Sequence, residues 1–301
     1  MSLSVYSQIQ ANKTRTWVIM FFFTIFIATV AYVLGNASGY GSSWTGIALI
    51  FSGLISLGSY YYGDRLVLSM SGAHPADRKK DFDLWTVSEN LAIASGIPKP
   101  KVYIIEDSAP NAFATGRDPH HAVICATRGL LDKLNRSELE GVISHELSHI
   151  QNYDTRLMAV ISILVGSVAF LSDWFMRSLW WGSNARNRND REGGRSLILV
   201  LGIIFAILSP LIATIIQLAL SRRREFLADA SGVLLTRNPQ GLACALSKIS
   251  ADREVLEAAT NATAHLYIIN PFKGKNFGSW FAGLFDTHPP IEERIKILRS
   301  M

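Results

Sequence analysis

Four long apolar blocks separate regions of mixed polarity along the chain. Residues 17–34 and 44–62 contain no charged residue and are joined by a short stretch rich in Gly and Ser. Two further blocks cover residues 157–174 and 196–220. A helix of about 20 apolar residues can cross the hydrocarbon core of a bilayer. The pattern therefore predicts about four transmembrane helices, arranged as two hairpins.

Between the second and third apolar blocks, the long apolar runs give way to short segments in which apolar and polar residues alternate. An amphipathic helix is predicted over residues 81–95, where Gly96 can cap it and Pro98 prevents its continuation. Turn residues then separate three short runs that alternate like strands. The predicted strands of this small sheet are residues 101–106, 111–116 and 121–126.

The next predicted helix carries the residues with the clearest chemistry. Ser137 and Glu140 have the spacing of a capping box, and apolar residues recur after them with helical period. His145 and His149 lie four residues apart, so their rings project from one face and can bind one metal ion. Glu146 lies beside the first histidine, where it can act on a metal-bound water as a base. The competing interpretation is a surface helix that carries two histidines by chance.

A second acidic pair follows the fourth apolar block. Glu225 and Asp229 are again one helical turn apart. A zinc hydrolase site needs a third protein ligand and leaves the fourth position to water. Glu225 can supply that carboxylate, and Asp229 can accept the free ring N–H of a zinc-bound histidine. Without the histidine motif, this stretch would be interpreted only as a charged helix end.

Composition and charge favour a membrane partner. The chain of 301 residues is 49% hydrophobic, with a mean hydropathy of +0.21 and a net charge of +5. The basic residues gather at the ends of the apolar blocks, and no basic-aromatic nucleic-acid motif is visible. We therefore expect a lipid bilayer and not a nucleic acid as partner. The two cysteines, Cys125 and Cys244, lack metal-ligand spacing and are expected to be free thiols.

The fold class that these elements predict is mainly α with a small β-sheet (α+β), in an integral membrane protein. Further helices are expected from Asn238-Pro239 and from Ile291. We expect four regions along the chain: a transmembrane hairpin, the first part of a zincin-like catalytic domain, a second hairpin, and the rest of the catalytic domain. Their ranges are 1–62, 63–156, 157–220 and 221–301.

The ordered motifs resemble the HtpX family of bacterial membrane zinc metalloproteases, which is related to the CAAX prenyl proteases. The resemblance rests on residues 145–149 (HELSH), residues 224–229 (REFLAD), residues 110–116 (PNAFATG) and residues 287–290 (THPP). It covers nearly the whole chain. It implies an endopeptidase of the bacterial inner membrane, active at the cytoplasmic face on membrane or misfolded proteins, in stress response and protein quality control.

The resemblance also implies roles for individual residues. It implies one zinc ion per chain, bound by His145, His149 and Glu225, with Glu146 as the catalytic base. His288 is implied to lie near the site, where it would stabilise the transition state. The strand implied to line the substrate cleft consists of Asn111, Ala112, Phe113 and Ala114.

Other residues compete for the role of third ligand. Asp154 would point away from the histidine pair if the helix continued to it, because it lies five residues past His149. His265 and His288 would give an all-nitrogen site, but both lie in a poorly patterned tail. Asp229 is better suited to orient a histidine because its side chain is shorter than that of Glu225.

Two other functions fit parts of the pattern. A membrane-bound zinc scaffold without turnover would need the ligands but not Glu146. A lipid-modifying or transport protein could use four spans, but these contain almost no ionisable residues. We therefore expect polypeptide substrates, and a zinc metalloendopeptidase is the leading hypothesis.

Overall fold

The structure is a computed structural model that describes residues 5–37, 43–164, 166–167, 222–260, 263–269, 271 and 289–301. The fourth apolar block, residues 165 and 168–174 of the third block, and His288 lie outside the described residues. The described elements are mostly helices around one small mixed sheet. This confirms the α+β class that the pattern predicts.

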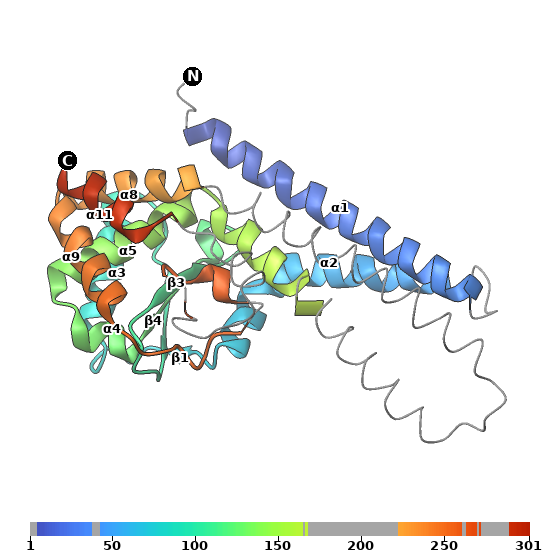
Figure 1. The fold of residues 1–301 in the computed structure, drawn as a ribbon, viewed down its shortest axis with the longest axis horizontal. Coiled ribbons are helices and arrows are strands. Elements are labelled where there is room, and N and C mark those ends of the chain that lie inside the picture. Colours follow the sequence, from blue (N-terminus) through green and yellow to red (C-terminus); the bar gives the residue numbers. More distant parts are fainter. Residues whose placement is uncertain are drawn as a thin grey trace.

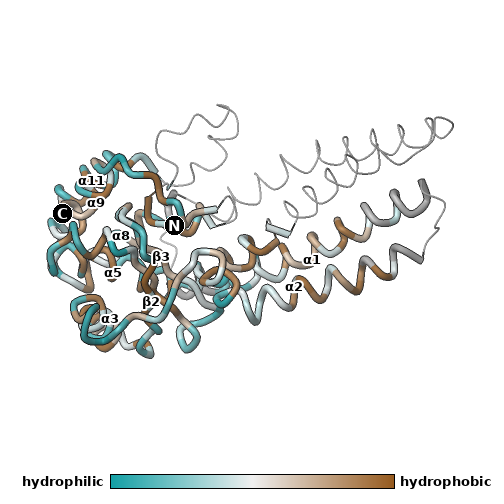
Figure 2. Tube along the Cα trace, turned by 90° about the horizontal axis from the view of Figure 1, so that it is seen from below, coloured by the Kyte–Doolittle hydropathy of each residue, from teal (hydrophilic) through white to brown (hydrophobic). Residues whose placement is uncertain are grey.

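Two long helices form a hairpin that projects from the rest of the protein (Figure 1). Helix α1 (Val5–Ala37) packs along α2 (Ser43–Met70), and each contains one of the first two apolar blocks. Figure 2 shows hydrophobic residues along both helices. Within the part of the chain that the structure describes, no helix is both long enough and apolar enough to cross a membrane.

The sheet has four strands in the order β1-β2-β4-β3. The bounds are β1 (His74–Pro75), β2 (Lys101–Ile105), β3 (Ala112–Thr115) and β4 (Val123–Thr127). Strands β2 and β4 are parallel, whereas β3 runs antiparallel to β4 at the edge of the sheet. The three predicted strands are present within about two residues, and the short β1 is an addition that the pattern did not predict.

The helices after the hairpin surround the sheet. Their bounds are α3 (Phe82–Ser95), η1 (Pro119–His121), α4 (Arg128–Lys133), α5 (Arg136–Gln151), α8 (Arg222–Thr236), α9 (Pro239–Ala251), η2 (Ala264–Leu266) and α11 (Ile291–Arg299). The predicted Gly96 cap of α3 is confirmed, with a left-handed φ of 71°. The predicted start of α5 is wrong by two residues, because the capping box is formed by Asn135 and Glu138.

Both faces of the sheet are buried. Ile104 and Ile124 face one core, which they share with apolar residues of α3, α5 and α9. Phe113 and Cys125 face a second core, which contains the end of α2 and residues of a helix over 154–164. Buried strands read as nearly continuous apolar runs, as β4 does. This packing fixes α5 against the sheet and near its edge strand β3.

Candidate metal centre

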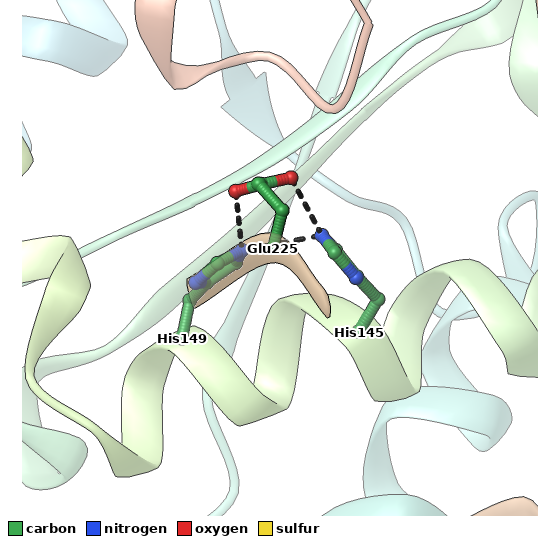
Figure 3. Close-up of side chains that lie close together, drawn as sticks. All are labelled: His145, His149 and Glu225. Atoms are coloured by element: carbon green, nitrogen blue, oxygen red, sulfur yellow. Dashed lines mark hydrogen bonds and ion pairs between the residues drawn. The ribbon is translucent and has the colours of Figure 1, made fainter. Parts of the chain in front are cut away.

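Three metal-binding side chains meet between α5 and α8. His145 and His149 project from α5, and Glu225 reaches them from the first turn of α8 (Figure 3). The two carboxylate oxygens of Glu225 lie 3.7 Å from Nε2 of His145 and 3.5 Å from Nε2 of His149. The two Nε2 atoms are 3.2 Å apart. The structure therefore brings together the three ligands that the family resemblance implies.

The spacing of these atoms fits one bound ion. Ligands at about 2.0–2.1 Å from a tetrahedral zinc ion are separated from one another by about 3.3 Å. The ligand atoms of the three residues all lie within 4.8 Å of one another. A set of two imidazoles and one carboxylate is also a common ligand set of catalytic zinc, with a further position left for water. The donor set therefore suits zinc without any large rearrangement.

A buried acid and a buried arginine orient the ring of His145. Its Nδ1–H donates to Asp229 at 2.9 Å, which leaves Nε2 free to bind a metal. Arg294 of α11 holds both oxygens of Asp229, through Nε at 2.8 Å and Nη2 at 2.7 Å. It also lies 3.4 Å from a carboxylate oxygen of Glu225 and is fully buried. The sequence analysis predicts the Asp229 contact but not the contacts of Arg294.

The ring of His149 has a matching arrangement on its other side. Its Nδ1–H donates to Asp154 at 3.0 Å, and Arg224 donates to the other oxygen of Asp154 at 2.8 Å. The helix does not continue to Asp154, because α5 ends at Gln151 and Tyr153 turns the chain with a φ of 60°. This turn brings Asp154 back beside the ring. Asp154 contacts Nδ1 and is not one of the three clustered ligands.

The proposed base lines a small space next to the ligands. Glu146, Ala114 and the three ligand residues surround a cavity of about 20 Å³. That volume is enough for one water molecule. Burial raises the pKa of Glu146 to about 7, and the charge of Glu225 adds to this effect. A carboxylate whose pKa lies near neutrality is well matched to proton transfer at physiological pH.

The electrostatics of the cluster favour a positive charge between the ligands. Burial alone would lower the pKa of His149, but the hydrogen bond to Asp154 and the charge of Glu225 raise it to about 9. Burial also opposes ionisation of Asp229, yet the charge of Arg294 lowers its pKa to about 2. The carboxylates that stabilise a proton on His149 would equally stabilise a divalent cation in its place.

The four residues expected to line a substrate cleft occupy different positions. All four are buried, and of them only Ala114 lines the cavity beside Glu146. The side chain of Asn111 donates to the carbonyl of Ile269 at 2.9 Å. The backbone N–H of Ile268 donates to the carbonyl of Ala112 at 3.0 Å, so the edge of β3 is already paired at that point.

The other candidate histidine of the tail is turned away from the cluster. His265 is buried, and its Nε2 lies 3.1 Å from Oγ of Ser162. It is not part of the group of three metal-binding residues. The implied role of His288 stays a prediction, because that residue lies outside the described part of the chain.

Comparison with known proteins agrees with this geometry. A family model described as peptidase family M48 matches residues 78–301. The chain belongs to peptidase family M48. The buried cluster therefore lies in a peptidase and is able to hold a metal ion.

The nearly full-length similarity also confirms the resemblance to HtpX. A protein named Protease HtpX homolog from Thermoanaerobacter pseudethanolicus is 43% identical over 303 residues, which cover 100% of this chain and 99% of that protein. One of the same name from Ligilactobacillus salivarius is 45% identical over 306 residues, which cover 99% of this chain and 100% of that protein. The crystal structure of S. mikatae Ste24p has a TM-score of 0.48 and 18% identity, covering 96% of this chain and 65% of that one.

Proposed function

We propose that this chain is a zinc endopeptidase that cleaves membrane or misfolded proteins. The observation that carries the proposal is the meeting of His145, His149 and Glu225 with Glu146 at one small cavity. A site that only stored metal would need the three ligands but no adjacent carboxylate. Glu146 makes no part of the ligand group and faces the space where a water would lie.

Each side chain has a distinct task in the proposed reaction. Bound by the two histidines and Glu225, zinc would polarise the peptide carbonyl and acidify a water molecule. Glu146 takes a proton from the attacking water as the new C–O bond forms. It then passes that proton to the leaving amine as the C–N bond breaks. Asp229 and Asp154 hold the histidine rings so that both present Nε2 to the ion.

The substrate is proposed to lie along the free part of β3. An extended peptide can add to a sheet edge through main-chain hydrogen bonds. Ala114 is the residue of β3 that lines the cavity, and the Ala114 backbone also hydrogen-bonds to Glu146. A peptide paired near Ala114 would pass directly over the base. Asn111 and Ala112 then support this strand through the segment at Ile268 and Ile269.

A bilayer is proposed as the setting of the reaction. The hairpin of α1 and α2 has large apolar side chains on its outside, whereas Ser52, Ser56 and Ser59 are buried. Oγ1 of Thr24 lies 3.4 Å from Oγ of Ser56 between the two helices. Small residues between helices and large apolar residues outside are typical of helices in lipid. The exposed apolar residues include Phe21, Phe22, Ile50, Phe51 and Leu54.

The proposed location is the bacterial inner membrane, with the site at the cytoplasmic face. Protein quality control follows from this setting, since loops and tails of damaged membrane proteins would be within reach. The four-span arrangement and the division of the catalytic domain into residues 63–156 and 221–301 are part of this proposal. The third and fourth apolar blocks must then bring the chain back to the same face.

The test compares the wild type with Glu146→Gln in lipid. Both proteins should bind one zinc ion per chain, because the substitution leaves all three ligands in place. Only the wild type should cleave an unfolded membrane protein, and mass spectrometry would identify the products. The variant amide is nearly isosteric but cannot accept the proton from water. If both proteins bind zinc and neither yields products, the scaffold without turnover is the better description.

A further inference from the structure

The amino-terminal end of α1 reaches the metal centre. Asn12 is one of its residues and is 1% exposed. Its side-chain N–H groups donate to the backbone carbonyl of Asn152 at 2.8 Å and to Oδ1 of Asp154 at 2.7 Å. Arg224 approaches the Asn12 amide oxygen at 3.4 Å. A residue of the projecting hairpin is therefore hydrogen-bonded to the acid that orients His149.

Asp154 joins three elements through its two oxygens. Oδ2 accepts from Nδ1 of His149, whereas Oδ1 accepts from both Asn12 and Arg224. A buried carboxylate needs such donors, because an unpaired buried charge is costly. With its Oδ1 held from two sides, the carboxylate cannot rotate freely away from the histidine. Asn12 thus restricts the orientation of the His149 ring through Asp154, although it does not contact that ring.

A second contact from α1 supports the same turn. The ammonium of Lys13 lies 4.3 Å from the ring centroid of Tyr153. Tyr153 has a left-handed backbone, with a φ of 60°, which a bulky residue adopts only when its surroundings hold it there. Asn12 binds the residues on either side of Tyr153, and Lys13 binds Tyr153 itself. Consecutive residues of α1 therefore clamp the turn that returns Asp154 to the site.

We propose that the amino-terminal end of α1 is a structural part of the metal centre, with Asn12 as a positioning residue that acts on His149 through Asp154. Metal affinity then depends on the docking of α1, and by linkage a bound metal strengthens that docking. This inference rests on the proposed zinc site. It assigns a function to the amino-terminal helix beyond attachment to lipid.

The test measures the zinc affinity of the full-length protein by competition with a chelator. Asp154→Asn should weaken zinc binding by about 10–100-fold, the usual effect of losing a partner of a metal-binding histidine. Asn12→Leu removes a hydrogen bond to Asp154 but leaves the contact between Asp154 and His149 in place. We therefore expect a smaller loss of zinc affinity, about 3–10-fold. Thr16→Val is the matched control. Thr16 is equally buried on the next turn of α1, and its hydroxyl donates to the backbone carbonyl of Asn12 without contacting Asp154 among the described residues.

A double variant separates positioning from a general effect on folding. If Asn12 acts through Asp154, adding Asn12→Leu to Asp154→Asn should weaken zinc binding no further. Additive losses, or an equal loss in Thr16→Val, would mean that α1 only stabilises the fold. Wild-type affinity in Asn12→Leu would also overturn the inference. Failure of the wild type itself to bind zinc would instead refute the proposed function.

A measurement on the unaltered sequence avoids the risk that Asn12→Leu does not fold. Hydrogen exchange of the α1 backbone around Asn12 should slow when zinc is added to the wild type. The same addition should change exchange much less in Asp154→Asn at saturating zinc, because the link from the ligand to α1 is broken. Equal slowing in both proteins would contradict the proposal.

Discussion

Arg224 and Glu225 are consecutive residues of α8, yet they hold opposite edges of the same histidine ring. A carboxylate oxygen of Glu225 lies 3.5 Å from Nε2 of His149, while Arg224 donates to Asp154, the partner of Nδ1. One turn of α8 thus fixes both the metal-facing and the rear side of that ring. The position of α8 against α5 is therefore central to the metal centre.

Loss of the third ligand should abolish tight zinc binding. Glu225→Ala removes one of three protein ligands, so we expect it to lose zinc and peptidase activity together. Asp229→Ala should weaken zinc binding by about 10–100-fold, because it removes only the orienting contact to His145. Metal content after dialysis against a mild chelator would check both. His288→Ala serves as the comparison and should retain zinc; loss of zinc there with retention in Glu225→Ala would overturn the ligand set.

Replacement of the buried Arg294 should lower the free energy of unfolding of the protein. Arg294→Met removes the buried guanidinium that contacts both Asp229 and Glu225, and loss of one partner of a buried ion pair typically costs about 3–5 kcal/mol. Zinc should recover part of this loss, since it supplies positive charge at the same place. Arg299→Met is the control on the same helix, because Arg299 is exposed. Denaturant unfolding with and without zinc would measure both effects, and equal stabilities of the two variants would contradict the assignment.

The sequence predicts most elements because their patterns are local. The helix period around His145 and His149, and the strand pattern before them, depend only on neighbouring residues. The predicted capping pair of α5 was wrong because Asn135 with Glu138 and Ser137 with Glu140 have the same spacing, and only packing decides between them. The short β1 has too few residues to carry a periodic signal.

The supporting residues of the site could not be predicted in the same way. Asp154 depends on the left-handed turn at Tyr153, and a Tyr in the sequence does not indicate such a backbone. Arg294 and Asn12 lie 149 and 133 residues from His145 along the chain, so no spacing rule links them. For Arg294 the sequence holds one weak signal, because it is a basic residue at a position of the carboxyl-terminal helix that otherwise faces the core.

A glycine at the crossing of α5 and α9 should resist substitution. A Cβ on Gly141 would lie 2.7 Å from the backbone nitrogen of Leu242, closer than packed atoms allow. Gly141→Ala should therefore destabilise the protein by about 1–3 kcal/mol, although Ala favours helices by about 1 kcal/mol. Gly58→Ala is the matched control within α2, because nothing lies within 4 Å of its Cβ position. Thermal unfolding in the same detergent would compare them, and a Gly141→Ala variant as stable as Gly58→Ala would contradict the close packing.

The carboxyl terminus should lie on the same side of the membrane as the amino terminus. His149 precedes the third apolar block and Glu225 follows the fourth, yet the two side chains lie 3.5 Å apart. The intervening chain must therefore cross a bilayer an even number of times, if it crosses at all. The basic residues at this side should make it cytoplasmic. They are Lys13, Arg15, Lys79, Lys80, Arg222, Arg223 and Arg224.

A reporter fused to the carboxyl terminus would check this orientation directly. A reporter enzyme that is active only in the cytoplasm should be active when it is fused to the carboxyl terminus. A reporter enzyme that requires export should show no activity at that position. The loop over residues 177–195 opposes the positive-inside rule, with five Arg against two acidic residues, and it lies outside the described residues. A second reporter in that loop distinguishes a full crossing from a hairpin that returns without crossing. A carboxyl-terminal reporter active only outside the cytoplasm would refute the assigned orientation, because the termini and both halves of the metal centre must share one side.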